Sequence, residues 1–161
     1  MRVIEKIEDM PKPEEILALS GMEFIKGILA GDLPAPPIAK LMNYNMHEVE
    51  PGRVVFRGEP KLEVCNPIGS VHGGWYGTLL DSAMACAVQT MLPKGTTYTT
   101  LEYKINIIRS IPIGRMIDCT GWTDHVGRST GVSHGEIRGV EDGKLYATGS
   151  TTCIVMTPPA G

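Results

Sequence analysis

The sequence predicts an α+β domain in which one long central helix is wrapped by a curled antiparallel sheet. The expected elements run in the order helix, two strands, long helix, four strands, which is not the alternation of a doubly wound α/β protein. Residues 73–92 form the long helix, and they are apolar on nearly every side, so this helix should be buried. Short turn sequences such as Asp142-Gly143 join the last four strands, which makes those strands antiparallel neighbours.

A helix and a stiff connector should precede this domain. Residues 13–30 place apolar side chains at intervals of three and four, behind a proline and two glutamates that suit a helix start. Residues 33–37, Leu-Pro-Ala-Pro-Pro, cannot continue the helix. We therefore expect residues 1–37 to form an N-terminal helix with a Pro-rich connector, and residues 38–161 to form the helix-and-sheet domain.

The six strands are expected from alternation of side chains and from turn residues. Within 97–108, the odd positions from Thr99 to Ile107 should share one face, and the even positions from Thr100 to Asn106 should share the other. The expected strands are residues 41–49, 53–57, 97–108, 116–125, 129–140 and 144–156.

Composition argues against several classes of function. The net charge of −3 and the scattered lysines and arginines give no basic footprint for nucleic acid. We expect neither a signal peptide nor a membrane span, because the first residues are charged and no apolar run approaches about 18 residues. The four cysteines are too widely spaced for a zinc site, which predicts reduced thiols and a cytoplasmic protein. No cofactor motif is present.

Asp81 is the most informative residue of the long helix. It carries the only formal charge between Glu63 and Lys94, if His72 is neutral. A carboxylate in apolar surroundings is costly unless it is paired or hydrogen-bonded. Asp81 is therefore either a functional group or a side chain that lies at an open edge or bonds a backbone group.

A second group of residues stands at the expected start of the same helix. The unpaired N–H groups there favour negative charge, and Gly73 and Gly74 let a substrate approach the backbone closely. Such a site can polarise a carbonyl group and stabilise an oxyanion, with His72 fixing the loop. The alternative is an ordinary glycine-rich helix start with a structural histidine.

The whole pattern Asn66-x5-His72-Gly73-Gly74-x6-Asp81 resembles the hotdog-fold thioesterases of the phenylacetate-degradation (PaaI-like) group, in the 4-hydroxybenzoyl-CoA thioesterase superfamily. The agreement of strand order covers about residues 41–156. The resemblance implies a single hotdog domain that hydrolyses acyl-CoA to free acid and CoA. Coenzyme A is then part of the substrate, and no separate cofactor or metal is expected.

The resemblance also implies roles for individual residues. Asp81 is the nucleophile or the general base, and the Gly73 N–H polarises the thioester carbonyl. His72 positions the loop, and Asn66 orients the attacking water or carboxylate. Thr100 assists Asp81, with Thr99 as the alternative because a slip of one residue reverses the faces of a strand.

Substrate contacts and subunit pairing follow from the same resemblance. Gly74, Arg128 and Ser129 are expected to bind substrate, with Arg128 near the nucleotide of coenzyme A. The active site should form between two subunits, where Asp81 and Thr100 of one face the loop of the other, and the dimers should pair into tetramers. An isolated long strand at 97–108 would otherwise be an exposed edge.

Two alternative functions stay open. One is a hotdog dehydratase of 3-hydroxyacyl thioesters, which requires a differently placed histidine and acid. The other is a non-catalytic acyl-CoA-binding or regulatory protein, in which Asp81 would be inert. A metal site at His125 and His134 is less favoured, because no further ligand has suitable spacing. The acyl group is left open between aromatic and aliphatic.

Overall fold

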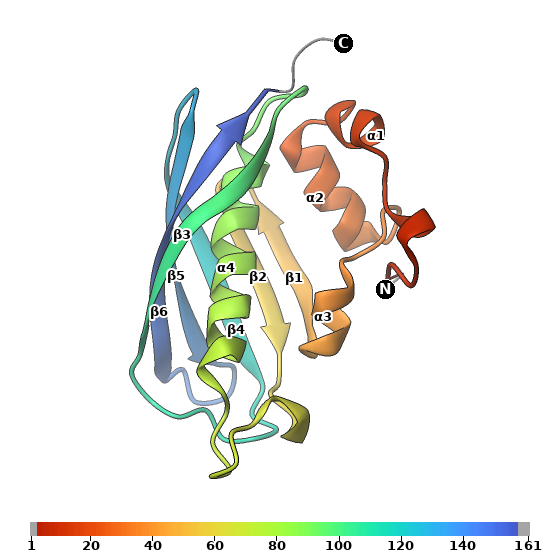
Figure 1. Ribbon diagram of the computed structural model, residues 1–161. Helices are drawn as coiled ribbons and strands as arrows, with labels where there is room; N and C mark the ends of the chain where they lie inside the picture. Colours follow the sequence, from red (N-terminus) through yellow and green to blue (C-terminus); the bar gives the residue numbers. More distant parts are fainter. Residues whose placement is uncertain (1–2, 158–161) are drawn as a thin grey trace.

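The computed structural model describes residues 3–157 and shows one long helix held within a curved six-stranded sheet (Figure 1). All strand pairs are antiparallel, and the strand order is β1-β2-β4-β5-β6-β3. The α-helices are α1 (Pro13–Leu17), α2 (Gly21–Ala30), α3 (Pro37–Leu41) and α4 (Gly73–Thr90). The strands are β1 (Tyr44–Glu50), β2 (Arg53–Gly58), β3 (Thr97–Ile107), β4 (Ile117–Val126), β5 (Thr130–Gly139) and β6 (Leu145–Met156). This arrangement confirms the predicted α+β fold with a wrapped central helix.

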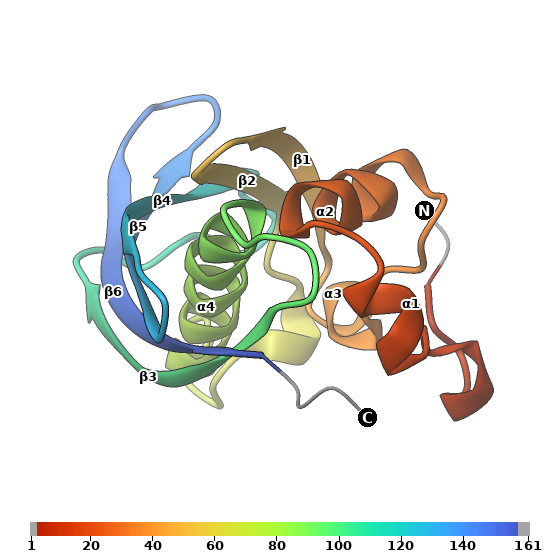
Figure 2. The ribbon, with the colours of Figure 1, turned by 90° about the horizontal axis from the view of Figure 1, so that it is seen from above.

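The N-terminal helices form a separate layer against α4 and β1. Seen from above, α4 lies between the curved sheet on one side and α1, α2 and α3 on the other (Figure 2). The Gly21 N–H donates to the Leu92 carbonyl oxygen at 3.0 Å, which ties the start of α2 to the end of α4. A side chain at Gly21 would collide with the Gln89 carbonyl oxygen, so the two helices meet in direct backbone contact.

Two expectations for the N-terminal part were wrong. Residues 13–30 form two helices because Ser20 caps α2: its Oγ accepts from the Glu23 N–H at 3.3 Å, while the Glu23 carboxylate accepts from the Ser20 N–H at 2.7 Å. This reciprocal capping starts a new helix in the middle of the apolar pattern. The strand expected to start at residue 41 starts at Tyr44, because the proline at the first position of α3 favours a helical turn there.

Strand β3 changes face at a bulge, which the predicted alternation missed. Pairing with β6 passes from Thr100–Cys153 to Glu102–Thr152, so Leu101 is an extra residue. Thr100 therefore points toward α4, and so do Tyr103 and Ile107 beyond the bulge, whose side chains lie over Gly77 and Gly73. The prediction that Thr100 lies on the face opposite the odd-numbered residues was therefore wrong for the residues beyond the bulge, such as Tyr103 and Ile107.

A row of three glycines brings α4 close to the sheet. Gly121, Gly135 and Gly149 are paired side by side across β4, β5 and β6, and all three face α4. A Cβ at Gly121 would collide with the backbone of Ala83, and one at Gly135 would lie 2.9 Å from Met84 Cγ. The helix position, and with it the position of Asp81, therefore depends on these glycines.

Gly121→Ala is expected to destabilise the protein by about 1–3 kcal/mol, because the added methyl group pushes α4 away from the sheet. Urea unfolding followed by circular dichroism measures the change. Ser150→Ala, an exposed change on β6, is the control and should stay within about 0.5 kcal/mol of wild type. Equal stability of the Gly121→Ala variant and wild type would contradict the close helix–sheet contact.

None of the described helices is both long and apolar enough to cross a membrane.

Candidate active site

Asp81 lies in the middle of α4 as a half-buried carboxylate with one recorded side-chain partner. Its Oδ1 accepts a hydrogen bond from Thr100 Oγ1 at 2.9 Å. Burial raises the pKa of Asp81 above its ordinary value of 3.8, and the hydrogen bond from Thr100 opposes this shift. Within residues 3–157, no backbone N–H donates to this carboxylate. Asp81 is therefore a partly desolvated group with raised basicity, and Thr100, not Thr99, is the threonine beside it.

The start of α4 leaves one backbone N–H free. His72 is the N-cap residue, and its Nδ1 accepts from the Gly74 N–H at 2.8 Å. The Trp75 N–H bonds the His72 carbonyl oxygen. No described residue accepts from the Gly73 N–H. Gly73 is thus the N–H donor available to a ligand, whereas the N–H of Gly74, a predicted substrate contact, is taken up by His72.

Asn66 lies in the loop that leads to this helix start. Its backbone N–H donates to the Ser70 carbonyl oxygen at 2.7 Å, and its Nδ2 donates to Ser70 Oγ at 3.2 Å. An isolated antiparallel β-bridge between the backbones of Cys65 and Val71 closes the loop. These bonds orient the half-buried amide, and its Oδ1 accepts no hydrogen bond from the described residues.

The predicted catalytic residues therefore form two groups, which a single chain keeps apart. Asp81 and Thr100 form one group, and the loop with Asn66, His72 and Gly73 forms the other. Gly73 and Asp81 are eight positions apart on α4, which corresponds to about 12 Å along the helix axis. One carbonyl group cannot contact both groups of the same chain.

Arg128 and Ser129, the other predicted substrate contacts, lie in the exposed turn between β4 and β5. Thr130 pairs with Ile154, which pairs with Thr99, so the turn lies at the Thr100 end of the sheet. The Ser129 carbonyl oxygen accepts from the Val155 N–H at 2.9 Å. The Arg128 guanidinium makes no ion pair or hydrogen bond with the described residues, so its charge is free for an anion.

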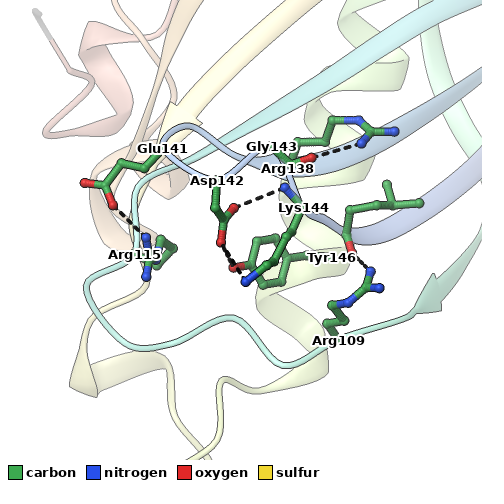
Figure 3. Close-up of polar contacts among 9 residues, drawn as sticks. Arg109, Arg115, Arg138, Glu141, Asp142, Gly143, Lys144 and Tyr146 are labelled. Carbon is green, nitrogen blue, oxygen red and sulfur yellow. Dashed lines mark hydrogen bonds and ion pairs between the residues drawn. The ribbon is translucent and has the colours of Figure 1, made fainter.

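A cluster of basic residues lies around the β5–β6 turn (Figure 3). This turn is at the end of the sheet opposite to Arg128. Three of the cluster's four cations are paired with carboxylates, namely Arg115 with Glu141, Arg138 with Glu136 and Lys144 with Asp142. The fourth, Arg109, donates to the Leu145 carbonyl oxygen at 2.7 Å. Because most of its charge is balanced internally, this cluster is a weaker candidate for a phosphate site than Arg128.

Trp75, Tyr76 and His134, for which the sequence left a functional role open, make contacts within the fold. Trp75 is buried and donates to the Met42 carbonyl oxygen, and the Tyr76 hydroxyl accepts from the Ile111 N–H at 2.8 Å. His134 bonds Asp124 and stacks on Trp122. Residues 3–157 contain no cluster of three or more histidine, cysteine, aspartate or glutamate side chains suited to a metal.

Sequence reasoning missed a pocket lined in part by Ser82, the residue that follows Asp81 in the chain. It has a volume of about 300 Å³ and lies between α4 and the N-terminal helices. Ser82, Cys86 and Gln89 of α4 line it, together with apolar residues of α2 and β1. The signal available in the sequence was Gln89, the one amide side chain of a helix that is mostly apolar.

Comparison with known proteins gives a family match and several solved structures with a similar fold. Residues 68–146 match the family model of the Thioesterase superfamily. No curated protein matches the chain. A phenylacetic acid degradation-related protein from Ralstonia eutropha is a similar solved structure, with 27% identity, coverage of 81% of this chain and 98% of that chain, and a TM-score of 0.74.

Two further solved structures are similar. The PaaI protein of the Escherichia coli phenylacetic acid degradation operon shares the fold, with 21% identity, coverage of 87% and 96%, and a TM-score of 0.72. A hypothetical thioesterase protein with coenzyme A, from Streptococcus pneumoniae, has 25% identity, coverage of 73% and 89%, and a TM-score of 0.65. These matches confirm the resemblance to PaaI-like hotdog thioesterases.

Proposed function

We propose, from its match to the Thioesterase superfamily, that this chain hydrolyses acyl-CoA thioesters to a free acid and CoA. The observation that carries the proposal is the Asp81 carboxylate, which is half-buried, has a raised pKa and is held by Thr100. Burial of this carboxylate destabilises the folded protein, and a catalytic role in hydrolysis explains why the residue is present.

In the proposed reaction, the Gly73 N–H donates to the thioester oxygen and stabilises the negative charge that develops there. Asp81 either attacks the carbonyl carbon or removes a proton from the attacking water. The carbon–sulfur bond breaks, and the CoA thiolate leaves and is protonated. With direct attack, water then cleaves the acyl–Asp81 anhydride. Asn66, whose Oδ1 is free, orients the water or the carboxylate.

The two halves of this site come from two copies of the chain. Strand β3 lies at one edge of the sheet, and an unpaired edge of 11 residues favours pairing with another strand. Within one chain, Thr100 marks the Asp81 end of β3 and Ile107 lies over Gly73. Antiparallel pairing that places Thr100 opposite Ile107 of a second copy brings Asp81 toward the second copy's Gly73.

This pairing has a defined centre. Thr100 and Ile107 are seven residues apart, so the two-fold axis passes between Tyr103 and Lys104. The edge carries exposed apolar side chains on both sides of this centre, among them Leu101 and Ile107. A further pairing of dimers into tetramers is implied by the family resemblance.

Coenzyme A should lie across the dimer with its phosphates near Arg128. The guanidinium pairs with no carboxylate among residues 3–157 and lies at the same end of the sheet as Thr100. A charged phosphate contact of this kind contributes mainly to binding and to the rate of association.

A panel of acyl-CoA thioesters, aromatic and aliphatic, tests the proposal through the release of free thiol. The protein's own four cysteines set the blank. We expect turnover of at least one member. If the protein binds acyl-CoA but hydrolyses no member, the non-catalytic binding alternative becomes the better account. Dehydration of a 3-hydroxyacyl thioester without thiol release would support the dehydratase instead.

A further inference from the structure

The loop that leads to α4 is held closed by its own backbone. The Asn66 N–H donates to the Ser70 carbonyl oxygen at 2.7 Å, and the Gly69 N–H donates to the Asn66 carbonyl oxygen at 2.9 Å. The His72 N–H donates to the Val64 carbonyl oxygen at 2.9 Å, which fixes the end of the loop to its beginning. These bonds fix the backbone of Asn66, but they leave the rotation of its terminal amide open, because that torsion has a broad, roughly two-fold preference.

Two side-chain contacts decide which end of this amide faces into the loop. Asn66 Nδ2 donates to Ser70 Oγ at 3.2 Å and makes a longer contact of 3.5 Å with the Val71 carbonyl oxygen. A carbonyl oxygen only accepts hydrogen bonds, so a reversed amide would place Oδ1 against it without a hydrogen bond. The Val71 carbonyl therefore selects the orientation, and Ser70 supplies the shorter of the two bonds that hold it.

In this orientation Asn66 presents an acceptor to the site, and its donors are taken up. An amide has two N–H donors and one oxygen acceptor, and Nδ2 is directed at the two loop acceptors. Oδ1 receives no hydrogen bond from residues 3–157, although Asn66 is half-buried. Neither an ionised Asp81 carboxylate nor a thioester carbonyl oxygen can donate to Oδ1, whereas water can. Of the two roles open to Asn66, orienting water or orienting the carboxylate, this geometry favours water.

We propose that Ser70 is a positioning residue for thioester hydrolysis, which holds the Asn66 amide with Oδ1 toward the attacking water. The inference rests on the proposed thioesterase function and adds a residue that acts through Asn66 and not on the substrate. Water in the proposed dimer donates one O–H to Asn66 Oδ1 and the other to the Asp81 carboxylate of the second copy. As the carbon–oxygen bond forms, Asp81 accepts that second proton, and it returns the proton to the CoA thiolate when the carbon–sulfur bond breaks.

A double-mutant cycle between Ser70 and Asn66 tests this role, with phenylacetyl-CoA and octanoyl-CoA as substrates. Ser70→Ala should lower kcat by about two- to tenfold, the effect of one neutral hydrogen bond, and leave KM unchanged. Ser70→Thr keeps the hydroxyl group and should retain wild-type kcat. Asn66→Ala should also lower kcat, and Ser70→Ala added to it should cause no further loss, because Ser70 acts only through Asn66.

A matched control distinguishes this role from a general effect of losing a serine hydroxyl. Ser150→Ala removes an exposed hydroxyl group on β6 and should keep wild-type kcat. The inference is overturned if Ser70→Ala has wild-type kcat, or if it lowers kcat by the same factor in the presence and absence of the Asn66 amide. The second result would mean that Ser70 only supports the loop.

Hydrogen exchange of side-chain amides, measured by NMR without substrate, separates failure of this inference from failure of the proposed function. The Asn66 Nδ2 protons should exchange more slowly than those of the exposed Asn45 of β1, and Ser70→Ala should accelerate only the former. If this pattern is found but neither thioester is hydrolysed, the proposed function fails and the amide orientation is supported. If hydrolysis is intact but Asn66 exchanges as fast as Asn45, the inference fails by itself.

Discussion

Asp81→Asn is expected to lower kcat for thioester hydrolysis by about 10²- to 10⁴-fold, because an amide can neither attack the carbonyl nor accept a proton from water. The side chain keeps its size, and its oxygen can still accept from Thr100 Oγ1. The loss should therefore appear in kcat and leave the affinity for acyl-CoA nearly unchanged.

The same substitution should make the protein more stable at neutral pH. Because burial raises the pKa of Asp81, the folded state binds this proton more tightly than the unfolded state does. Stability contributed by the protonated carboxyl is fully present below about pH 3.8, the ordinary value, and is lost as the pH rises through the folded-state pKa. Asparagine carries no charge at this position, so the Asp81→Asn variant does not lose this stability as the pH rises.

The two effects are measured on the same preparations. Thiol release gives kcat, and urea unfolding at pH 4 and pH 7 gives the stability difference, which should be larger at pH 7. Asp124→Asn removes a carboxylate from the exposed outer face and serves as the charge-matched control, with activity near that of wild type. An Asp81→Asn protein with wild-type kcat would remove Asp81 from the mechanism.

The second large effect is expected at the sheet edge. Ile107→Asp should dissociate the proposed dimer and reduce hydrolysis to background, because a charge would be buried between two β3 strands and each site would lose its Gly73 donor. Ile107 is 48% exposed within one chain, so its replacement should leave the isolated fold intact.

Ile113→Asp is a matched control. Ile113 is 47% exposed but lies in the loop between β3 and β4, away from the edge. Light scattering should give the monomer mass for Ile107→Asp, which is half the wild-type mass for a dimer and a quarter for a tetramer. Ile113→Asp should keep the wild-type mass and activity. An active monomer would show that one chain completes the site by itself.

The sequence alone determined the fold class and the principal residues of the candidate site. The reason is local: hydrophobic periodicity and turn residues define strands and helices independently of distant contacts. An isolated carboxylate in an apolar helix can likewise be recognised from the sequence alone. Asp81 was accordingly identified as an isolated charge and the His72-Gly73-Gly74 segment by its position at the expected helix start, whereas their catalytic roles are implied by the family resemblance. The structure places them in the middle and at the start of α4.

Tertiary structure decided the features that depend on a partner strand or on packing. The bulge at Leu101 arises from pairing with β6, so the alternation within β3 could not reveal that Thr100 shares a face with Tyr103. Likewise, the capture of the Gly74 N–H by His72 depends on local geometry that residue types do not encode.

The pocket between α4 and the N-terminal helices has the same origin. Residues of α2 and α4 both line it, and Gly21 lets these two helices meet in direct backbone contact although Gly21 and Gln89 are nearly 70 positions apart in the chain. Gln89 was visible in the sequence as a polar residue in a mostly apolar helix, but its unpaired, buried oxygen was not. Periodicity determines which residues lie on one face of an element, whereas packing determines what that face contacts and which polar atoms are left without a partner.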